Sequence, residues 1–196
     1  MWGRRRSSGT GPVVQAAVIG AQGHGKSTLV RALAEALPQE FRQPSPPSPP
    51  SGPSGPSERS GLFATARGPY QLYDCLGLDD FRSRLAVGAH QLGGALLVVS
   101  AQDGPLPETR EYLAAARAAG VARIAVFLGK RDLVDDAEIN ELVELEIREL
   151  LHEEGYPGDH CPVVHGSALQ AVQKAGSRRE RSDMVRLAEA LDRHFG

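Results

Sequence analysis

The chain has 196 residues and a formal net charge of −2, from 22 Lys+Arg and 24 Asp+Glu. Hydrophobic residues make up 41% and charged residues 23%, which is typical of a globular domain and argues against a disordered, fibrous or membrane-spanning chain. The near-neutral charge argues against a protein that follows nucleic-acid phosphates, and two cysteines favour a reducing compartment, so we expect a cytoplasmic monomer with no membrane segment.

The first predicted elements surround a glycine-rich loop. Residues 1–12 carry three consecutive arginines and are expected to form a flexible basic arm, because the apolar stretch after them leads into the glycine loop and not into a signal cleavage site. Residues 13–19 are apolar except for Gln15 and partly β-branched, which predicts a buried strand. Residues 27–37 are predicted to form a helix that ends at Pro38.

Half of the 14 prolines lie in one segment, residues 44–57, whose other seven residues are serine and glycine. Proline removes backbone donors, and none of these residues supplies apolar surface to bury, so neither a helix nor a strand is expected there. The segment is predicted to be disordered.

The remaining pattern alternates short apolar strands with helices. Strands are predicted at residues 70–74, 95–99, 123–128 and 162–165. Helices are predicted at residues 108–119, from the caps Asp135 and Asp136 to Gly155, and at residues 184–195. Continuously apolar strands that alternate with helices indicate an α/β fold, with a parallel sheet covered by helices on both faces. Ligands of such sheets bind beyond the carboxyl ends of the strands.

Residues 20–27, Gly-Ala-Gln-Gly-His-Gly-Lys-Ser, match the phosphate-binding pattern G-x-x-x-x-G-K-[ST] between a predicted strand and a predicted helix. Glycines let successive backbone N–H groups surround phosphate oxygens, and the helix N-terminus adds a partial positive charge. Lys26 is expected to reach the β- and γ-phosphates, and Ser27 to ligate Mg²⁺. The predicted nucleotide contacts are Gly20, Gln22, Gly23, His24, Gly25, Lys26, Ser27 and Thr28. A glycine-rich turn that fits the pattern by chance is the alternative.

Three further polar sequences follow predicted strands. Asp74 is placed to hold a metal ion through water, and Gly77 leaves a backbone N–H free to approach a γ-phosphate. The Asp132 carboxylate can accept both N1–H and N2–H of guanine, while the stem of Lys130 lies over the base. The last sequence, whose backbone N–H groups can contact the guanine oxygen, is Ser167-Ala168-Leu169. Taken singly, the first also fits an ordinary turn, the second fits a charged loop that caps a buried strand, and the last has almost no specificity.

The four sequences occur in the order of the translational GTPase family, and the stretch between them resembles the G domain of elongation factor Tu. The likeness is most specific from about residue 94 to residue 169. The resemblance implies a P-loop NTPase fold over residues 13–196, in three α/β/α layers with a mostly parallel sheet of about six strands. It also implies GTP or GDP with Mg²⁺ as ligands, and the metal contacts Ser27 and Asp74.

The chain departs from the family pattern at several positions. Leu78 stands where the family has a catalytic histidine, and Gly129 replaces the asparagine of the N-K-x-D motif. The segment 44–57 stands in place of switch I. By register, Leu62 falls where the family has the threonine that completes the Mg²⁺ shell, with Ser60 and Thr65 two or three residues away.

These features predict slow, Mg²⁺-dependent GTP hydrolysis of the elongation factor Tu type, with Lys26 and Gly77 as the remaining catalytic positions. The alternatives are a guanine-nucleotide-binding module that does not hydrolyse GTP, and a degenerate elongation-factor paralogue that acts through a protein partner or a ribosome-related factor. The two β-barrels with which the family holds tRNA do not follow the G domain here, so tRNA is not an expected partner.

Overall fold

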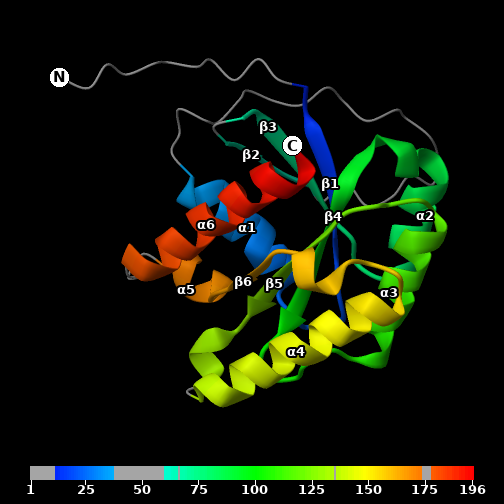
Figure 1. The fold of residues 1–196 in the computed structure, drawn as a ribbon. Coiled ribbons are helices and arrows are strands. Elements are labelled where there is room, and N and C mark those ends of the chain that lie inside the picture. Colours follow the sequence, from blue (N-terminus) through cyan, green and yellow to red (C-terminus); the bar gives the residue numbers. More distant parts are fainter. Residues whose placement is uncertain (1–11, 38–59, 66, 135, 174–177) are drawn as a thin grey trace.

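The computed structural model describes residues 12–37, 60–65, 67–134, 136–173 and 178–196. Its centre is a six-stranded sheet in the order β2-β3-β1-β4-β5-β6 (Figure 1). The strands are β1 (Val14–Ile19), β2 (Ser60–Ala64), β3 (Pro69–Asp74), β4 (Leu92–Ser100), β5 (Ile124–Gly129) and β6 (Val163–His165). Neighbouring strands are parallel except β2 and β3, which pair antiparallel. The predicted mostly parallel sheet is confirmed.

Helices cover both faces of the sheet, which makes the three predicted layers (Figure 1). They are α1 (Lys26–Ala36), α2 (Leu78–Gly88), α3 (Pro107–Ala118), α4 (Ala137–Glu153), α5 (Ala168–Val172) and α6 (Arg178–Phe195), with short 3-10 turns η2 (Ala89–Gln91), η3 (Arg131–Leu133) and η4 (Gly158–His160). Buried residues of α1, α5 and α6 form one apolar cluster with the sheet, and those of α2, α3 and α4 form a second.

The central strand β1 shows why its sequence is apolar after Gln15. Ala16 and Val18 belong to the cluster on one face of the sheet, and Ala17 and Ile19 belong to the cluster on the other. Because successive side chains of a strand point to opposite faces, a strand covered on both sides has no position for a polar residue in its centre. The same two-sided burial applies to β4 and β5.

Three elements, β2, α2 and α5, have no counterpart among the predicted ones. Helix α2 buries Phe81 fully and Leu78 and Leu85 partly, a short apolar stripe between charged residues that the prediction missed. In β2, Gly61 allows α1 to come close: a Cβ atom there would lie 2.3 Å from Cγ1 of Val30. Helix α6 begins at Arg178, before the predicted start at 184. Its first turns are polar, so no apolar pattern in the sequence indicates them.

Two predictions fall largely or wholly outside the described residues: the basic arm at 1–12, of which only Pro12 is described, and the disordered segment at 44–57. The predicted cap Asp135 also lies outside them, whereas Asp136 caps α4 by accepting a hydrogen bond from the backbone N–H of Glu138 at 2.8 Å. Among the described helices, none has both the length and the apolar character that crossing a membrane requires.

Candidate functional site

The four polar sequences meet at one edge of the sheet. They follow β1, β3, β5 and β6, which are parallel, so all four lie beyond the carboxyl ends of their strands. The loop after β6 also contacts β5 and the loop that follows it: the backbone N–H of Gly166 donates to the Leu128 carbonyl of β5 at 3.0 Å, and that of Arg131 donates to the Gly166 carbonyl at 3.4 Å. The expected grouping of these residues is therefore present.

The loop after β1 has a backbone that requires glycine. Gly20, Gly23 and Gly25 have φ angles of 139°, 81° and 95°, values that L-residues rarely adopt. At Gly20 a Cβ atom would also lie 2.2 Å from the Val98 carbonyl oxygen of β4. Gln22 and Gly23 are exposed at the tip of the loop. The three glycines thus give the loop the tight curve of a phosphate-binding turn.

Lys26 turns back into this loop. Its ammonium Nζ donates hydrogen bonds to the carbonyl oxygens of Gly20 at 2.7 Å and Ala21 at 3.1 Å. The residue is 8% exposed, and burial lowers the pKa of its ammonium group. A buried cation held by two neutral carbonyls has no full counter-charge in these contacts, and an entering phosphate would supply one.

Ser27 and Asp74 bring two oxygen atoms together where the loop meets β3. Ser27 Oγ donates to Asp74 Oδ2 at 2.5 Å, and Asp74 is 3% exposed. Thr28, the next residue of α1, is half-buried. In the part of the chain that the structure describes, no group of three or more His, Cys, Asp or Glu side chains is arranged to hold a metal ion. The pair nevertheless suits Mg²⁺, which proteins hold through one or two oxygen ligands while phosphates and water complete its shell.

Gly77 and Leu78 form the start of α2 next to this pair. Gly77 is extended, and a Cβ atom there would meet nothing within 4 Å, so its backbone is open to a ligand. The Leu78 side chain packs against the apolar cluster of α2, α3 and α4. An aliphatic side chain in apolar contact offers a water molecule no hydrogen bond.

The loop after β5 is shaped by Lys130, which has a left-handed φ of 58° although it is not glycine. Its Nζ lies 3.5 Å from Asp103 Oδ2, in the turn after β4. Asp132 follows in η3 and is half-buried. Asp103 was not among the predicted site residues, because its partner is 27 positions away and only the fold brings the two together.

The loop after β6 starts α5. Ser167 is buried and caps the helix, its hydroxyl accepting from the backbone N–H of Gln170 at 3.3 Å. Ala168 is buried, and Leu169 is 51% exposed. The Ser167 side chain therefore caps α5, and the preceding Gly166 connects the start of this helix to the loop after β5.

Gly129, which ends β5, lies against an aromatic ring. A Cβ atom at Gly129 would be 3.2 Å from Cε1 of Phe127, and one at Gly166 would be 3.2 Å from Cε2 of the same ring. The buried Phe127 ring thus packs against the end of β5 and against the loop after β6. At Gly129 it takes part of the space that the side chain of an asparagine would need.

His24 is 2% exposed within the glycine loop, and its Nε2 lies 4.0 Å from Asp103 Oδ2. Burial lowers the pKa of its imidazole. A neutral, buried imidazole supports the shape of the loop from inside, in keeping with a packing role.

The residues at or near the position expected for the switch I threonine lie at different places along β2 and beyond it. Ser60 pairs with Tyr73, one residue before Asp74, whereas Leu62 pairs with Gln71 in the middle of the strand. Thr65 lies beyond the opposite end, where its Oγ1 donates to Asp192 Oδ1 of α6 at 2.5 Å. Of these residues, only Ser60 is at the end of the hairpin that faces the site.

Both cysteines are buried thiols. Burial raises the pKa of Cys75 to about 12 and also raises the pKa of Cys161. At pH 8 a pKa near 12 leaves about one thiolate in 10⁴. We expect neither thiol to react with an aromatic disulfide reagent within minutes in the native protein, and both to react at once in guanidinium chloride. A fast-reacting thiol in the native protein would contradict this burial.

Comparison with known protein families gives one match over most of the chain. The model described as "Elongation factor Tu GTP binding domain" matches residues 59–196. The matched range includes the sequences after β3, β5 and β6, and the glycine loop after β1 precedes it.

Proposed function

Since the chain belongs to the elongation factor Tu GTP-binding domain family, we propose that its four loops bind GDP and GTP together with Mg²⁺. The observation that carries the proposal is the Lys26 ammonium, buried inside a glycine loop and adjacent in sequence to the Ser27–Asp74 pair. The glycine loop lies outside the matched range, so this geometry supports the proposal independently of the family.

Three parts of the chain contribute to the phosphate end of the site. Backbone N–H groups of residues 20–25 surround the β-phosphate, and Lys26 neutralises charge on the β- and γ-phosphates. Ser27 and Asp74 would hold Mg²⁺, which supplies charge stabilisation for the phosphates when bound. The extended Gly77 leaves its N–H free for the γ-phosphate.

The base end lies between the loops after β5 and β6. Asp132 accepts from N1–H and N2–H of guanine, and the Lys130 stem covers one face of the base. The backbone of Ser167-Ala168-Leu169 donates to the guanine oxygen. The two hydrogen bonds of Gly166, one with the end of β5 and one with the loop that follows it, support a single pocket.

We propose that GTP hydrolysis at this site is slow. The Leu78 side chain packs in the apolar cluster and cannot orient or deprotonate an attacking water. The same packing favours a second function, a guanine-nucleotide-binding module that acts by occupying a protein partner and hydrolyses little GTP. We propose residues 13–196 as one domain, monomeric and cytoplasmic, where its free thiols suit a reducing compartment.

One experiment tests the proposal and separates the two functions. The purified protein is denatured, released nucleotide is identified by chromatography, and phosphate release from GTP and from ATP is followed with Mg²⁺ or with EDTA. Binding of GDP and GTP but not ATP, with slow Mg²⁺-dependent phosphate release, supports the slow enzyme. Binding without release supports the module, and no guanine-nucleotide binding would overturn both.

Restoring a histidine tests the role of position 78. We expect Leu78→His to raise GTP turnover about tenfold or more, because a positioned acid–base group typically contributes about 10²–10⁴-fold. The control is Val87→His on the same helix, where the replaced side chain is 66% exposed. Turnover is measured as phosphate release at saturating GTP. Equal turnover in Leu78→His and Val87→His would mean that position 78 does not limit hydrolysis.

A further inference from the structure

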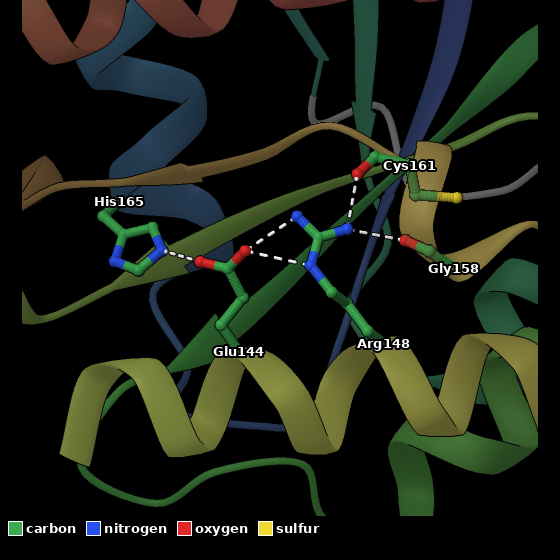
Figure 2. A network of polar contacts seen from close by, with 5 residues as sticks. All are labelled: Glu144, Arg148, Gly158, Cys161 and His165. Carbon is green, nitrogen blue, oxygen red and sulfur yellow. Dashed lines mark hydrogen bonds and ion pairs between the residues drawn. The ribbon is translucent and has the colours of Figure 1, made fainter. Parts of the chain in front are cut away.

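A line of polar contacts connects α4 to the edge strand β6 (Figure 2). The Glu144 carboxylate accepts from His165 Nε2 at 2.5 Å through one oxygen, and from Arg148 Nε and Nη2 at 2.9 and 2.7 Å through the other. Arg148 Nη1 donates to the carbonyl oxygens of Gly158 at 2.6 Å and Cys161 at 3.3 Å. One carboxylate and one guanidinium thus connect the helix to both ends of the strand.

The chemistry of these groups makes the contacts specific. A carboxylate only accepts, so the hydrogen between it and the imidazole belongs to His165 Nε2. Burial alone would raise the pKa of Glu144, but the hydrogen bonds from His165 and Arg148 outweigh it and leave the pKa below its ordinary value. All three side chains are about three-quarters buried, at 23–26% exposure, so solvent screens the contacts less than it would at the open surface.

Strand β6 depends on such support because it is short and lies at the edge. It has three residues and, within the described residues, pairs only with β5, along Val126↔Val163 to Leu128↔His165. On the entry side, Gly158 lies so close to α4 that a Cβ atom there would be 2.3 Å from the Arg148 carbonyl oxygen. Arg148 therefore fixes the start of the strand and Glu144 fixes its end.

The end of β6 leads directly into the loop that is proposed to contact the guanine base. Gly166 directly follows His165; its backbone N–H donates to Leu128 of β5, and its carbonyl accepts from Arg131 in the loop after β5. Ser167 then begins α5, where the backbone N–H groups proposed to meet the guanine oxygen lie. A shift of His165 would therefore move these donors relative to Asp132.

We propose that Glu144 and His165 are positioning residues for guanine: their hydrogen bond holds the end of β6 so that the backbone of residues 167–169 reaches the O6 atom of the base. This inference rests on the proposed binding of guanine nucleotides. It assigns a role in base recognition to α4, a helix that carries none of the proposed nucleotide contacts.

The test uses the full chain and three diphosphates that differ at the base. GDP and inosine diphosphate carry O6, and 2-aminopurine riboside diphosphate lacks it. We expect His165→Leu to lower the affinity for GDP and inosine diphosphate about tenfold, the effect of losing about one hydrogen bond, and to change the affinity for the 2-aminopurine nucleotide less than twofold. His165→Gln, which restores an N–H donor to Glu144, should recover most of the loss.

The matched control is Arg110→Gln, which breaks the surface ion pairs of Arg110 with Glu153 and Glu154 at the other end of α4. It should leave all three affinities unchanged. Equal losses for all three nucleotides in His165→Leu would indicate general loosening and overturn the proposal, as would no loss for GDP. A wild-type protein that binds none of the three would instead overturn the proposed function, and this inference with it.

Discussion

Replacing Lys26 by methionine is expected to lower the affinity for GDP and GTP by a factor of about 100 or more. Methionine keeps the length and apolar stem of the side chain and removes the ammonium that lies against Gly20 and Ala21. Each hydrogen bond from a charged group contributes about 1.5–3 kcal/mol, so two such bonds to phosphate account for about 3 kcal/mol or more. That energy corresponds to a factor of about 10² in the dissociation constant.

The fold should tolerate this change, because the substitution also removes the cost of burying a charge at a residue that is 8% exposed. We therefore expect the thermal midpoint without nucleotide to be unchanged or higher, while the rise of the midpoint with excess GDP becomes smaller than in the wild type. Calorimetric titration with GDP and thermal unfolding with and without GDP measure the two effects.

A control on the same helix separates phosphate binding from net charge. Arg31 is largely exposed and pairs with Glu35 at 3.8 Å. Arg31→Met changes the net charge by the same amount as Lys26→Met and should leave GDP affinity within about twofold, since surface pairs contribute little. Equal GDP affinity in Lys26→Met and Arg31→Met would show that the phosphates do not enter the glycine loop.

The parts of the fold that the sequence predicts are those decided locally or by two-sided burial. The buried centres of β1, β4 and β5 are apolar because clusters lie on both of their faces. The grouping of Lys26, Asp74 and Asp132 at one edge follows from parallel strands alone. By contrast, the apolar stripe of α2 is short, only Leu78, Phe81 and Leu85 between charged residues, and the prediction missed it.

The contacts that the sequence does not reveal join residues far apart in the chain. Nothing local to Thr65 distinguishes it from a metal-binding threonine, yet the antiparallel pairing of β2 carries it away from the site to Asp192. Likewise, Asp103 contacts Lys130, and Glu144 contacts His165, only because the strands that bear or precede them are neighbours. Without the sheet order, nothing in the sequence distinguishes these residues from other charged residues.

Asp132→Asn is expected to reverse the preference between guanine and xanthine nucleotides. The aspartate accepts two hydrogen bonds from guanine, and an asparagine offers one acceptor and one donor in their place. GDP should lose about 10²-fold in affinity, from two charge-assisted bonds of about 1.5–3 kcal/mol each. Xanthosine diphosphate carries an oxygen where guanine has its amino group, so it should gain a hydrogen bond from the new amide.

Backbone hydrogen bonds hold the turn around Asp132, so Asp132→Asn changes the side chain without changing the turn. η3 is closed by the N–H of Leu133 on the Lys130 carbonyl at 3.0 Å and by that of Val134 on the Arg131 carbonyl at 3.2 Å, so an isosteric side chain leaves the loop in place.

Competition between labelled GDP and each nucleotide measures the two affinities. The same exchange at a nearby cap, Asp136→Asn, is the matched control, because asparagine caps a helix as well as aspartate does and GDP affinity should not change. If Asp132→Asn binds GDP as the wild type does, the base does not contact this carboxylate, and the pocket between the loops after β5 and β6 has been assigned to the wrong end of the nucleotide. If GDP affinity falls without a gain for xanthosine diphosphate, the carboxylate contributes through its charge and not through the paired hydrogen bonds.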